Sequence, residues 1–476
     1  MASTYLSKTP SSSGDRKTWT WSGWIKRSNL GSEQSFFGAY TGGNDYVVAQ
    51  FDSDDTLNFT HKHINASGGS LSNQTKRKIT NRKFRDTNAY YHIVIKFDAA
   101  NTNCDIYVNG TEETSFSVNE EPENRDYAVN HTDIHYLGGF PHSVTGIADT
   151  KFDGIISHVH LCDGYAYTPS NFGSTDATTG EWKINTAPSV SYGTNGYFLL
   201  KDGNSVTDQS GQGNNYSVAA GTLTNTEDSP SNVFCTMNPL NHDYAYTDTD
   251  IGAGNTFVYP RANANYNYAV STLAMPKGNG KFYAEAKYIT YDTVTAGVGI
   301  VDMDYVSEIF YQNRNLPEQT NSTYIGRVIY LKNGYSIIPS TENNSYGSSY
   351  ANGDIIQIAC DMENGAIYFG KNGTWQNSGD PTSGASKTGA IDISAQSWYT
   401  GTTHWGFWCG DKATNHDRFA WNFGNGNFAS ASGSFGSQTY STTAVSSAGS
   451  NASGIGIFEY DVPTGYTALS TKGLNE

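Results

Sequence analysis

The 476-residue sequence is poor in charged side chains and in residues that favour helices. Charged residues make up 16% of it, well below the roughly 25% of an average soluble domain. Glycine occurs 50 times and aromatic residues make up 13%, while Asn, Ser, Thr and Tyr replace the missing charges. Residues suited to pleated strands and tight turns therefore dominate. This composition predicts an all-β protein, and the length predicts two or three domains.

Cysteine is also scarce, with five residues, an odd number, and no C-x-x-C pair. This pattern excludes a disulfide framework and a structural zinc site. We expect buried free thiols and folding in a reducing cytoplasm. The cysteines are Cys104, Cys162, Cys235, Cys360 and Cys409.

Long apolar runs and a signal peptide are both missing. No stretch approaches the 18 apolar residues of a transmembrane helix, and the opening "MASTYLSKTP" has neither a basic nor an apolar region. The net charge of −16 repels nucleic acid and anionic membranes at long range. We therefore expect no nucleic-acid partner and no membrane insertion.

The motifs of common enzyme classes are absent as well. The sequence holds no G-x-S-x-G elbow, P-loop or H-E-x-x-H. A retaining glucanase needs paired carboxylates, and no E-x-D-x-x-E run supplies them; "DMDYVSE" (302–308) comes closest. We expect a non-enzymatic protein, with a polysaccharide depolymerase as the least favoured alternative.

Short strand patterns fill most of the chain. In "TWTWSGWIKR" (18–27) Trp19 and Trp21 share one face of a strand, and turn signals such as Asn109-Gly110 separate successive patterns. Such repeats predict two tandem antiparallel β-sandwich (jelly-roll) domains. We assign residues 1–200 to the first domain, 201–245 to a Gly/Asn/Ser-rich linker, 246–430 to the second domain, and 431–476 to a Ser/Gly-rich loop and C-terminal strand or tail.

Four segments of the second domain resemble SPRY domains. The hairpin "NGDIIQIACDMENGAIYFGKNGTW" (352–375) resembles the central SPRY hairpin, and three other segments occur in the expected order. The first domain resembles a laminin-G/concanavalin A-like jelly roll through "WTWSGWIKR", "YYHIVIKFD…CDIYVNG" and "FDGIISHVHLCDG". The other SPRY-like segments are "AVSTLAMPKGNGKFYAEAKYI", "AGVGIVD" and "RFAWNFG".

The combination of these modules resembles virion proteins of tailed bacteriophages, through "DSPSNVFCTMNPL" between the modules and the "VPTGYTALST" tail. The resemblance implies a tail fibre, spike or head fibre, located in the virion and assembled in the host cytoplasm. Its lectin-like modules would bind host-surface glycans, with other virion proteins as further partners. A homo-oligomer such as a trimer is expected. The alternative is a capsid or tail decoration or connector protein that binds virion proteins.

Two sets of residues are candidates for ligand contact. Trp398 and Tyr399 precede a Gly-Thr-Thr turn, where exposed rings would stack on sugars; core packing is the alternative. The basic run "KRKITNRKFR" (76–85) includes Arg77, Arg82 and Arg85 and would bind anionic polysaccharide or an acidic neighbour. Its alternative is a solvated loop balanced by the nearby acidic run.

Two further sets are candidates for metal binding. Asp52, Asp54 and Asp55 in "FDSDDTLNF" would ligate Ca²⁺, although the Gly and final Glu of an EF-hand loop are missing. No other cofactor is expected. The pairs His61/His63 and His158/His160 are spaced i, i+2, so each shares a strand face and would chelate a metal. Polar faces of exposed strands are the alternative.

Overall fold

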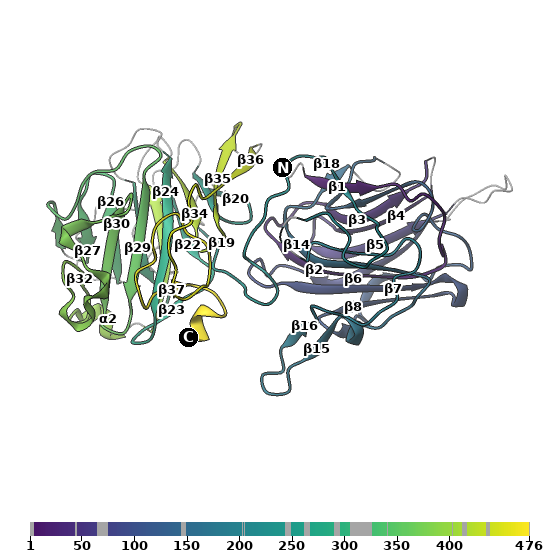
Figure 1. Cartoon of the computed structure of the whole chain (residues 1–476), viewed down its shortest axis with the longest axis horizontal. Helices are drawn as coiled ribbons and strands as arrows, with labels where there is room; N and C mark the ends of the chain where they lie inside the picture. Colours follow the sequence, from purple (N-terminus) through teal and green to yellow (C-terminus); the bar gives the residue numbers. More distant parts are fainter. Residues whose placement is uncertain are drawn as a thin grey trace. The chain divides into compact units, whose positions relative to one another are not determined.

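The chain divides into two compact units, Met1–Asn225 and Thr226–Glu476, each built from β-strands (Figure 1). The all-β prediction and the prediction of two antiparallel β-sandwiches are confirmed. The computed structural model describes residues 4–42, 45–63, 75–143, 149–201, 203, 205–242, 249–260, 267–289, 296–304, 326–339, 341–401, 403–411, 417–434 and 438–475. None of the helices in these ranges is long and apolar enough to cross a membrane.

Two antiparallel sheets form the first unit. The eight-stranded sheet has the order β10 (Phe116–Asn119), β6 (Thr75–Lys83), β5 (Thr56–Lys62), β4 (Tyr46–Phe51), β3 (Gln34–Tyr40), β11 (Ile134–Leu137), β1 (Tyr5–Lys8) and β18 (Ser217–Ala220). The six-stranded sheet has the order β17 (Tyr197–Leu199), β14 (Gly154–Asp163), β2 (Thr18–Arg27), β7 (Tyr91–Asp98), β8 (Asn103–Val108) and β9 (Thr111–Glu112). Two small hairpins complete it: β12 (Gly139–Phe140) with β13 (Thr150–Lys151), and β15 (Gly173–Thr175) with β16 (Trp182–Ile184).

Aromatic side chains fill the core between these sheets. Trp19 and Trp21, two residues apart on β2, point to the same side and are completely buried, as the period of a strand requires. Trp19 stacks on Phe97 with ring centroids 4.7 Å apart, and Trp21 stacks on Phe37 at 5.6 Å. Alternation along single strands therefore produces the sandwich core.

The other face of the six-stranded sheet is also covered. Val94 lies between two core residues of β7 and points to the opposite side, where it packs with Phe172, Tyr192 and Phe198. These three come from the chain that follows β14. The β15–β16 hairpin adds Trp182, whose Nε1 donates a hydrogen bond of 3.0 Å to Nδ1 of His92 on β7. The segment that covers this face also carries the candidate site described below.

The second unit has two larger sheets and one separate hairpin. The eight-stranded sheet has the order β19 (Met237–His242), β22 (Asn267–Ser271), β33 (His404–Asp411), β25 (Gly297–Asp302), β26 (Arg327–Leu331), β27 (Ser336–Ile338) and β28 (Thr341–Asn343), with β23 (Met275–Pro276) beside β33. The nine-stranded sheet has the order β20 (Thr249–Gly252), β21 (Phe257–Pro260), β34 (Arg418–Asn422), β24 (Lys281–Ile289), β29 (Ile355–Asp361), β30 (Ala366–Lys371) and β31 (Thr374–Trp375). β32 (Ile391–Asp392) pairs with β30, β37 (Thr467–Ala468) pairs in parallel with β24, and β35 (Asn427–Ser432) pairs with β36 (Thr439–Ala444).

The predicted hairpin at 352–375 forms as β29 and β30. Ile358 pairs with Phe369 and Cys360 pairs with Ile367, and all four side chains are completely buried in one core cluster. Gly365 takes a φ of 64° in the turn, a conformation that costs glycine little. The regularity of this hairpin is therefore explained by core packing.

The structure differs from the prediction of a linker at 201–245. Tyr216 is buried in the first core, and β18 pairs with β1. Further along, Phe234 and Cys235 are 1% exposed within clusters of the second unit. The unit boundary falls at Asn225. Asn and Asp side chains in this polar stretch bind backbone N–H groups, which lets the chain pack without regular strands.

The C-terminal segment forms the predicted last strand as β37, but much of the chain before this strand is packed into the unit and is not a free loop. Phe458 and Tyr466 are buried in a cluster with Tyr283 of β24, and Leu469 belongs to the main core of the second unit. Scattered apolar residues in a Ser/Gly-rich context thus anchor residues 455–469. All five cysteines are buried and free, as predicted.

Candidate ligand-binding site

The two aromatic residues predicted to stack on a ligand lie on α2 (Ser397–Gly401). Tyr399 is 5% exposed, its hydroxyl donates to the Met362 carbonyl at 3.3 Å, and the ammonium of Lys277 lies 4.6 Å from its ring centroid. Trp398 is half-buried and packs against Trp405. The prediction of two exposed rings is wrong, because the short helix turns Tyr399 into the core.

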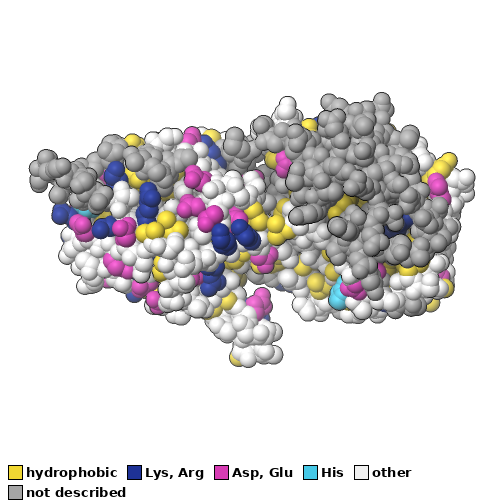
Figure 2. Space-filling model, turned by 180° about the vertical axis from the view of Figure 1, so that it is seen from behind, with side chains coloured by type: hydrophobic (Ala, Val, Ile, Leu, Met, Phe, Trp, Pro, Cys, Tyr) yellow, Lys and Arg dark blue, Asp and Glu magenta, His cyan; other side chains and the backbone are white. Residues whose placement is uncertain are grey.

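The basic run does not form a separate cationic patch. Most of it is β6, so its side chains alternate between the two faces of a sheet. Arg82 pairs with Glu113 at 2.7 Å, and Arg85 pairs with Asp55 at 2.9 Å. The backbone N–H of Arg77 donates to Glu120. On the face drawn in Figure 2, basic and acidic side chains are interspersed. The structure thus agrees with the alternative of charges balanced by nearby acids.

The three aspartates predicted to bind calcium face different partners. Asp52 accepts hydrogen bonds from Asn58, and Asp54 accepts from Thr56. Among the described residues, no group of three acidic, histidine or cysteine side chains converges as a metal site. The prediction of a converging set is therefore wrong.

The Asp55 carboxylate forms ion pairs with two arginines of the protein. Its Oδ1 lies 3.1 Å from Arg27 and its Oδ2 lies 2.9 Å from Arg85. Burial acts to raise its pKa, but the Gly31 N–H and the two guanidinium groups outweigh burial and hold the pKa of Asp55 below its usual value. This carboxylate serves the internal charge balance.

The histidine pairs are buried, so neither of their two predicted roles is found. His61 is completely buried in the first core, and burial lowers its pKa to about 3. His160 is 2% exposed and stacks on Phe198 with centroids 4.0 Å apart. Both rings are neutral near pH 7 and act as core side chains.

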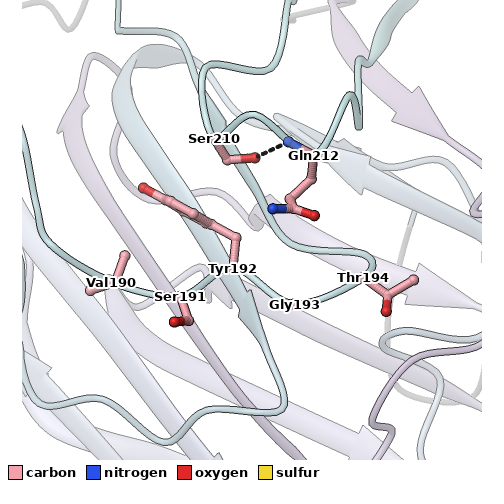
Figure 3. A pocket seen from close by; sticks show the side chains of 7 residues that line it. All are labelled: Val190, Ser191, Tyr192, Gly193, Thr194, Ser210 and Gln212. Carbon is pink, nitrogen blue, oxygen red and sulfur yellow. Dashed lines mark hydrogen bonds between the residues drawn. The ribbon is translucent and has the colours of Figure 1, made fainter.

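A pocket of about 450 Å³ lies on the first unit, between two chain segments that the sequence did not single out (Figure 3). One segment precedes β17 and the other follows it. Three lining residues, Ser191, Thr194 and Gln212, are exposed to solvent. The lining residues are Val190, Ser191, Tyr192, Gly193, Thr194, Ser210 and Gln212.

Asp163, at the end of β14, fixes the first segment. Its Oδ2 accepts a hydrogen bond from the Asn195 backbone N–H at 2.9 Å, and its own N–H donates to the Tyr192 carbonyl at 2.9 Å. Gly193 between them has a φ of 68°, and a Cβ there would lie 2.1 Å from the Asp163 carbonyl oxygen. Only glycine fits this close approach.

Asp208 fixes the second segment. Its carboxylate accepts hydrogen bonds of 2.8 Å from Phe198 N–H, from Ser210 N–H and hydroxyl, and from Asn214 N–H. The Asn214 amide then donates to the carbonyls of Thr194 and Gly196. The two segments are thus tied together, and the pocket is held open before any ligand arrives.

The floor of the pocket is neutral. The Tyr192 hydroxyl and His160 Nδ1 are hydrogen-bonded at 3.0 Å. Burial raises the pKa of Tyr192 and lowers the pKa of His160, so neither group is charged near pH 7. None of the seven lining residues is charged. Their hydroxyl and amide groups can donate and accept hydrogen bonds from a neutral ligand rich in hydroxyls.

Residues that build this site were present in the sequence pattern, but their composition led us to assign them to a linker. Asp208, Ser210 and Asn214 fall in the segment assigned to a linker, because Asp, Ser, Asn and Gly are typical of both linkers and turns. In "DQSGQGNN" (208–215) polar side chains follow Asp208 at every second position, Ser210, Gln212 and Asn214. This pattern is compatible with a tight turn around the Asp208 carboxylate. Its contact with residues 190–194 is a tertiary feature.

Comparison with known proteins supports the concanavalin A-like resemblance of the first part of the chain. Residues 2–171 match the family model of the concanavalin A-like lectin/glucanases superfamily, in agreement with the resemblance seen in the sequence. The match covers about a third of the chain and ends before the pocket-lining residues. No curated protein matches the chain.

Three solved structures are among those to which the chain is similar. The SPRY domain of human HERC1 is 13% identical over 39% of this chain and 96% of its own, with a TM-score of 0.29. A putative carbohydrate binding protein from Bacteroides ovatus is 17% identical over 46% of this chain and 58% of its own, with a TM-score of 0.31. Mouse laminin α1 domains LG4-5 are 10% identical over 88% of this chain and 79% of their own, with a TM-score of 0.28. Likenesses this distant carry no functional argument.

Proposed function

We propose that the first unit is a non-catalytic carbohydrate-binding module and that the pocket at 190–194 and 210–212 is its binding site. The observation that carries this proposal is the uncharged, hydroxyl-rich lining, held open by two buried carboxylates. The match of residues 2–171 of the same unit to a superfamily of lectins and glucanases supports the same ligand class.

Binding follows from hydrogen bonding on a preformed surface. Ser191, Thr194, Ser210 and Gln212 supply donors and acceptors for sugar hydroxyls. Because the segments are already ordered, little conformational entropy is lost on binding. For such a shallow site we expect a monovalent Kd on the order of 0.1–1 mM, which corresponds to a binding free energy of about 4–5.5 kcal/mol.

We propose that the module is non-catalytic because no carboxyl group lines the pocket. Retaining hydrolysis needs two carboxyl groups about 5–5.5 Å apart, whereas the pocket lining contributes none. Asp208 is not among the lining residues, and its carboxylate accepts four hydrogen bonds from the protein's own N–H and hydroxyl groups. Incubation with laminarin and with host capsular polysaccharide should release no new reducing ends; a steady release would favour a depolymerase instead.

The binding site is tested by glycan-array screening of the full chain, followed by calorimetry with the best neutral glycan. Gln212→Ala should weaken binding about threefold to tenfold, since it removes one exposed hydrogen-bonding group without disturbing the core. Gln209→Ala is the matched control, because Gln209 is exposed on the same segment but outside the lining. Equal affinities of the two variants would refute the assignment of the site.

At a finer level, we propose that the module is displayed on a bacteriophage particle as part of a tail fibre, spike or head fibre. The support is the resemblance of the two-module order and of the "DSPSNVFCTMNPL" and "VPTGYTALST" segments. Immunogold labelling of intact particles should mark an external position. Labelling only after the particles are opened would contradict display on the surface.

For the second unit, we propose a structural role in the virion protein. Tyr399 is buried, and Trp398 is half-buried against the core, so the aromatic pair that the sequence offered for sugar contact stabilises the fold. A decoration or connector protein would use this unit to bind other virion proteins. Cross-linking mass spectrometry on particles would separate the roles: cross-links from residues 226–476 to virion proteins are expected.

A further inference from the structure

Two tyrosines lie next to the pocket without lining it. Tyr165 is 40% exposed, one of the few large apolar side chains of the described residues that reach solvent to this extent. Its ring lies nearly parallel to that of Tyr167, with an interplanar angle of 11° and a centroid distance of 5.5 Å. One ring thus supports the other.

The pair is held rigidly by the six-stranded sheet. The buried hydroxyl of Thr20 on β2 donates to the Tyr165 carbonyl at 2.7 Å and accepts from the Tyr167 N–H at 2.7 Å. The Tyr167 ring also meets Phe172 edge-on. Both backbone positions are therefore fixed, and stacking on Tyr167 restricts the Tyr165 ring, so little rotational freedom is lost when a ligand covers that ring.

The pair is connected directly to the pocket. The backbone N–H of Ser191, a lining residue, donates to the Tyr167 hydroxyl at 3.0 Å. The phenol end of Tyr167 thus lies at the pocket rim, and the exposed Tyr165 ring stacks beside it. An exposed aromatic face beside a group of hydroxyls and an amide suits the apolar face of a second sugar ring.

We propose that Tyr165, supported by Tyr167, is a second subsite, and that the ligand is therefore a neutral oligosaccharide of at least two sugar units. This inference rests on the proposed function of the pocket. One unit is hydrogen-bonded in the pocket and the next stacks on Tyr165. The seven lining residues and the tyrosine pair include no cation, so uronic acids, sialic acids and sulfated sugars are not the preferred ligands.

The test is a series of neutral glycans of one, two, three and six units, from glucan, galactan, mannan and xylan, titrated against the full chain by calorimetry. Sialylated and sulfated counterparts accompany them. We expect affinity for a bound series to rise about tenfold between one and three units and then to level off. Anionic counterparts should bind no more tightly than the neutral ones.

Variants distinguish the two parts of the site. Tyr165→Ala should remove the tenfold gain of the longer glycans and leave the single-unit affinity unchanged. Tyr165→Phe, which keeps the ring, should retain the gain. Tyr335→Ala, a half-buried tyrosine of the second unit, serves as a control and should change nothing.

Each of the other outcomes refutes one specific part of the proposal. If affinity is independent of glycan length, or if Tyr165→Ala leaves the gain intact, the second subsite is refuted while the pocket remains. If anionic glycans bind more tightly, the neutral class is refuted. If no glycan binds at any length, the proposed function fails and this inference fails with it.

Discussion

Both units use buried carboxyl groups to fasten irregular chain onto a β-sandwich, but with opposite results. In the first unit, Asp163 and Asp208 hold two polar segments whose outer surfaces stay open to solvent. In the second unit, Glu285 on β24 is completely buried and holds residues 459 and 460 through their backbone N–H groups at 2.9 Å. Hydrogen bonds from backbone N–H groups to a buried carboxyl group thus leave an open pocket in the first unit, whereas in the second unit they hold a segment that covers the sheet.

The difference lies in the residues that the fastened chain carries. Next to Glu459, Phe458 packs edge-on against Tyr283 with centroids 4.9 Å apart, and Val462 and Tyr466 join the same buried cluster. The segment at 190–194 instead carries hydroxyl groups outward. A buried carboxyl group thus fixes the path of the chain, and the neighbouring side chains decide whether that chain presents an open polar surface or packs into the core.

The two units should also respond to pH in opposite directions. In the first unit, burial lowers the pKa of His61 and His92 to about 3 and that of His135 to about 4. The Asn130 N–H donates to Nε2 of His135 and Trp182 donates to Nδ1 of His92, so both rings must accept as neutral groups. In the second unit, burial raises the pKa of Glu285 to about 7.

The largest expected effect is acid destabilisation of the first unit. A histidine with a lowered pKa in the folded state contributes stability above its unfolded pKa of about 6.5 and loses it as the pH falls toward the folded value. Between pH 7.5 and 5, each of the three histidines should cost about 2 kcal/mol. Pulse-labelling hydrogen exchange in urea, read from peptides of each unit, measures this.

A matched pair of variants sharpens this prediction. His61→Phe should remove about 2 kcal/mol of the acid loss in peptides from 4–225, since the ring lies among Phe59, Phe97 and Tyr127. His131→Gln, at a half-exposed position, should not. Equal acid sensitivity of the two variants would contradict a neutral, buried His61.

The next effect has the opposite sign and belongs to the second unit. Because the folded pKa of Glu285 lies above its unfolded value of about 4.5, stability is full below pH 4.5 and is lost as the pH rises through 7. The free energy of unfolding of the second unit should fall by about 2–3 kcal/mol between pH 5 and 8. Glu285→Gln should remove this pH dependence.

The control for Glu285 is Glu363→Gln, a half-exposed carboxylate beside Lys281, which should leave the pH dependence intact. The measurement is again hydrogen exchange in urea, read from peptides of β24 and of residues 455–469. A second unit whose stability is flat from pH 5 to 8 would show that the hydrogen bonds to Glu285 fully offset its burial.

The smallest expected effect on stability, but the one most closely tied to function, concerns Asp208. Asp208→Asn places an amide donor opposite N–H groups that now donate to a carboxylate, at a cost of about 1–3 kcal/mol. The loss should appear in peptides from 190–215, together with glycan binding weakened at least fivefold. Glu112→Gln on the exposed edge strand β9 is the control. If Asp208→Asn bound glycan as tightly as the unmodified protein, the Asp208 carboxylate would not be needed to shape the binding site.

Local pattern predicted much of the fold. Trp19 and Trp21 of β2 occupy alternate positions, as do Ile356, Ile358 and Cys360 of β29, and this period alone places each set on one face of its strand. The same logic failed for Tyr399, because two adjacent aromatic residues before a turn are compatible with both a loop and a helical turn. It also could not place the partners of the basic run, because acids that pair with it, such as Glu113 and Asp55, lie in connections between strands, outside β6.

The sequence by itself determined the class of fold, the free thiols and the absence of familiar catalytic motifs, since these depend on composition and on spacing within single strands. Tertiary structure alone decided the site. The pocket exists because Asp163, residues 190–194 and Asp208 meet across gaps of tens of residues, and hydrogen bonds between such distant groups follow from the path of the whole chain rather than from any local pattern.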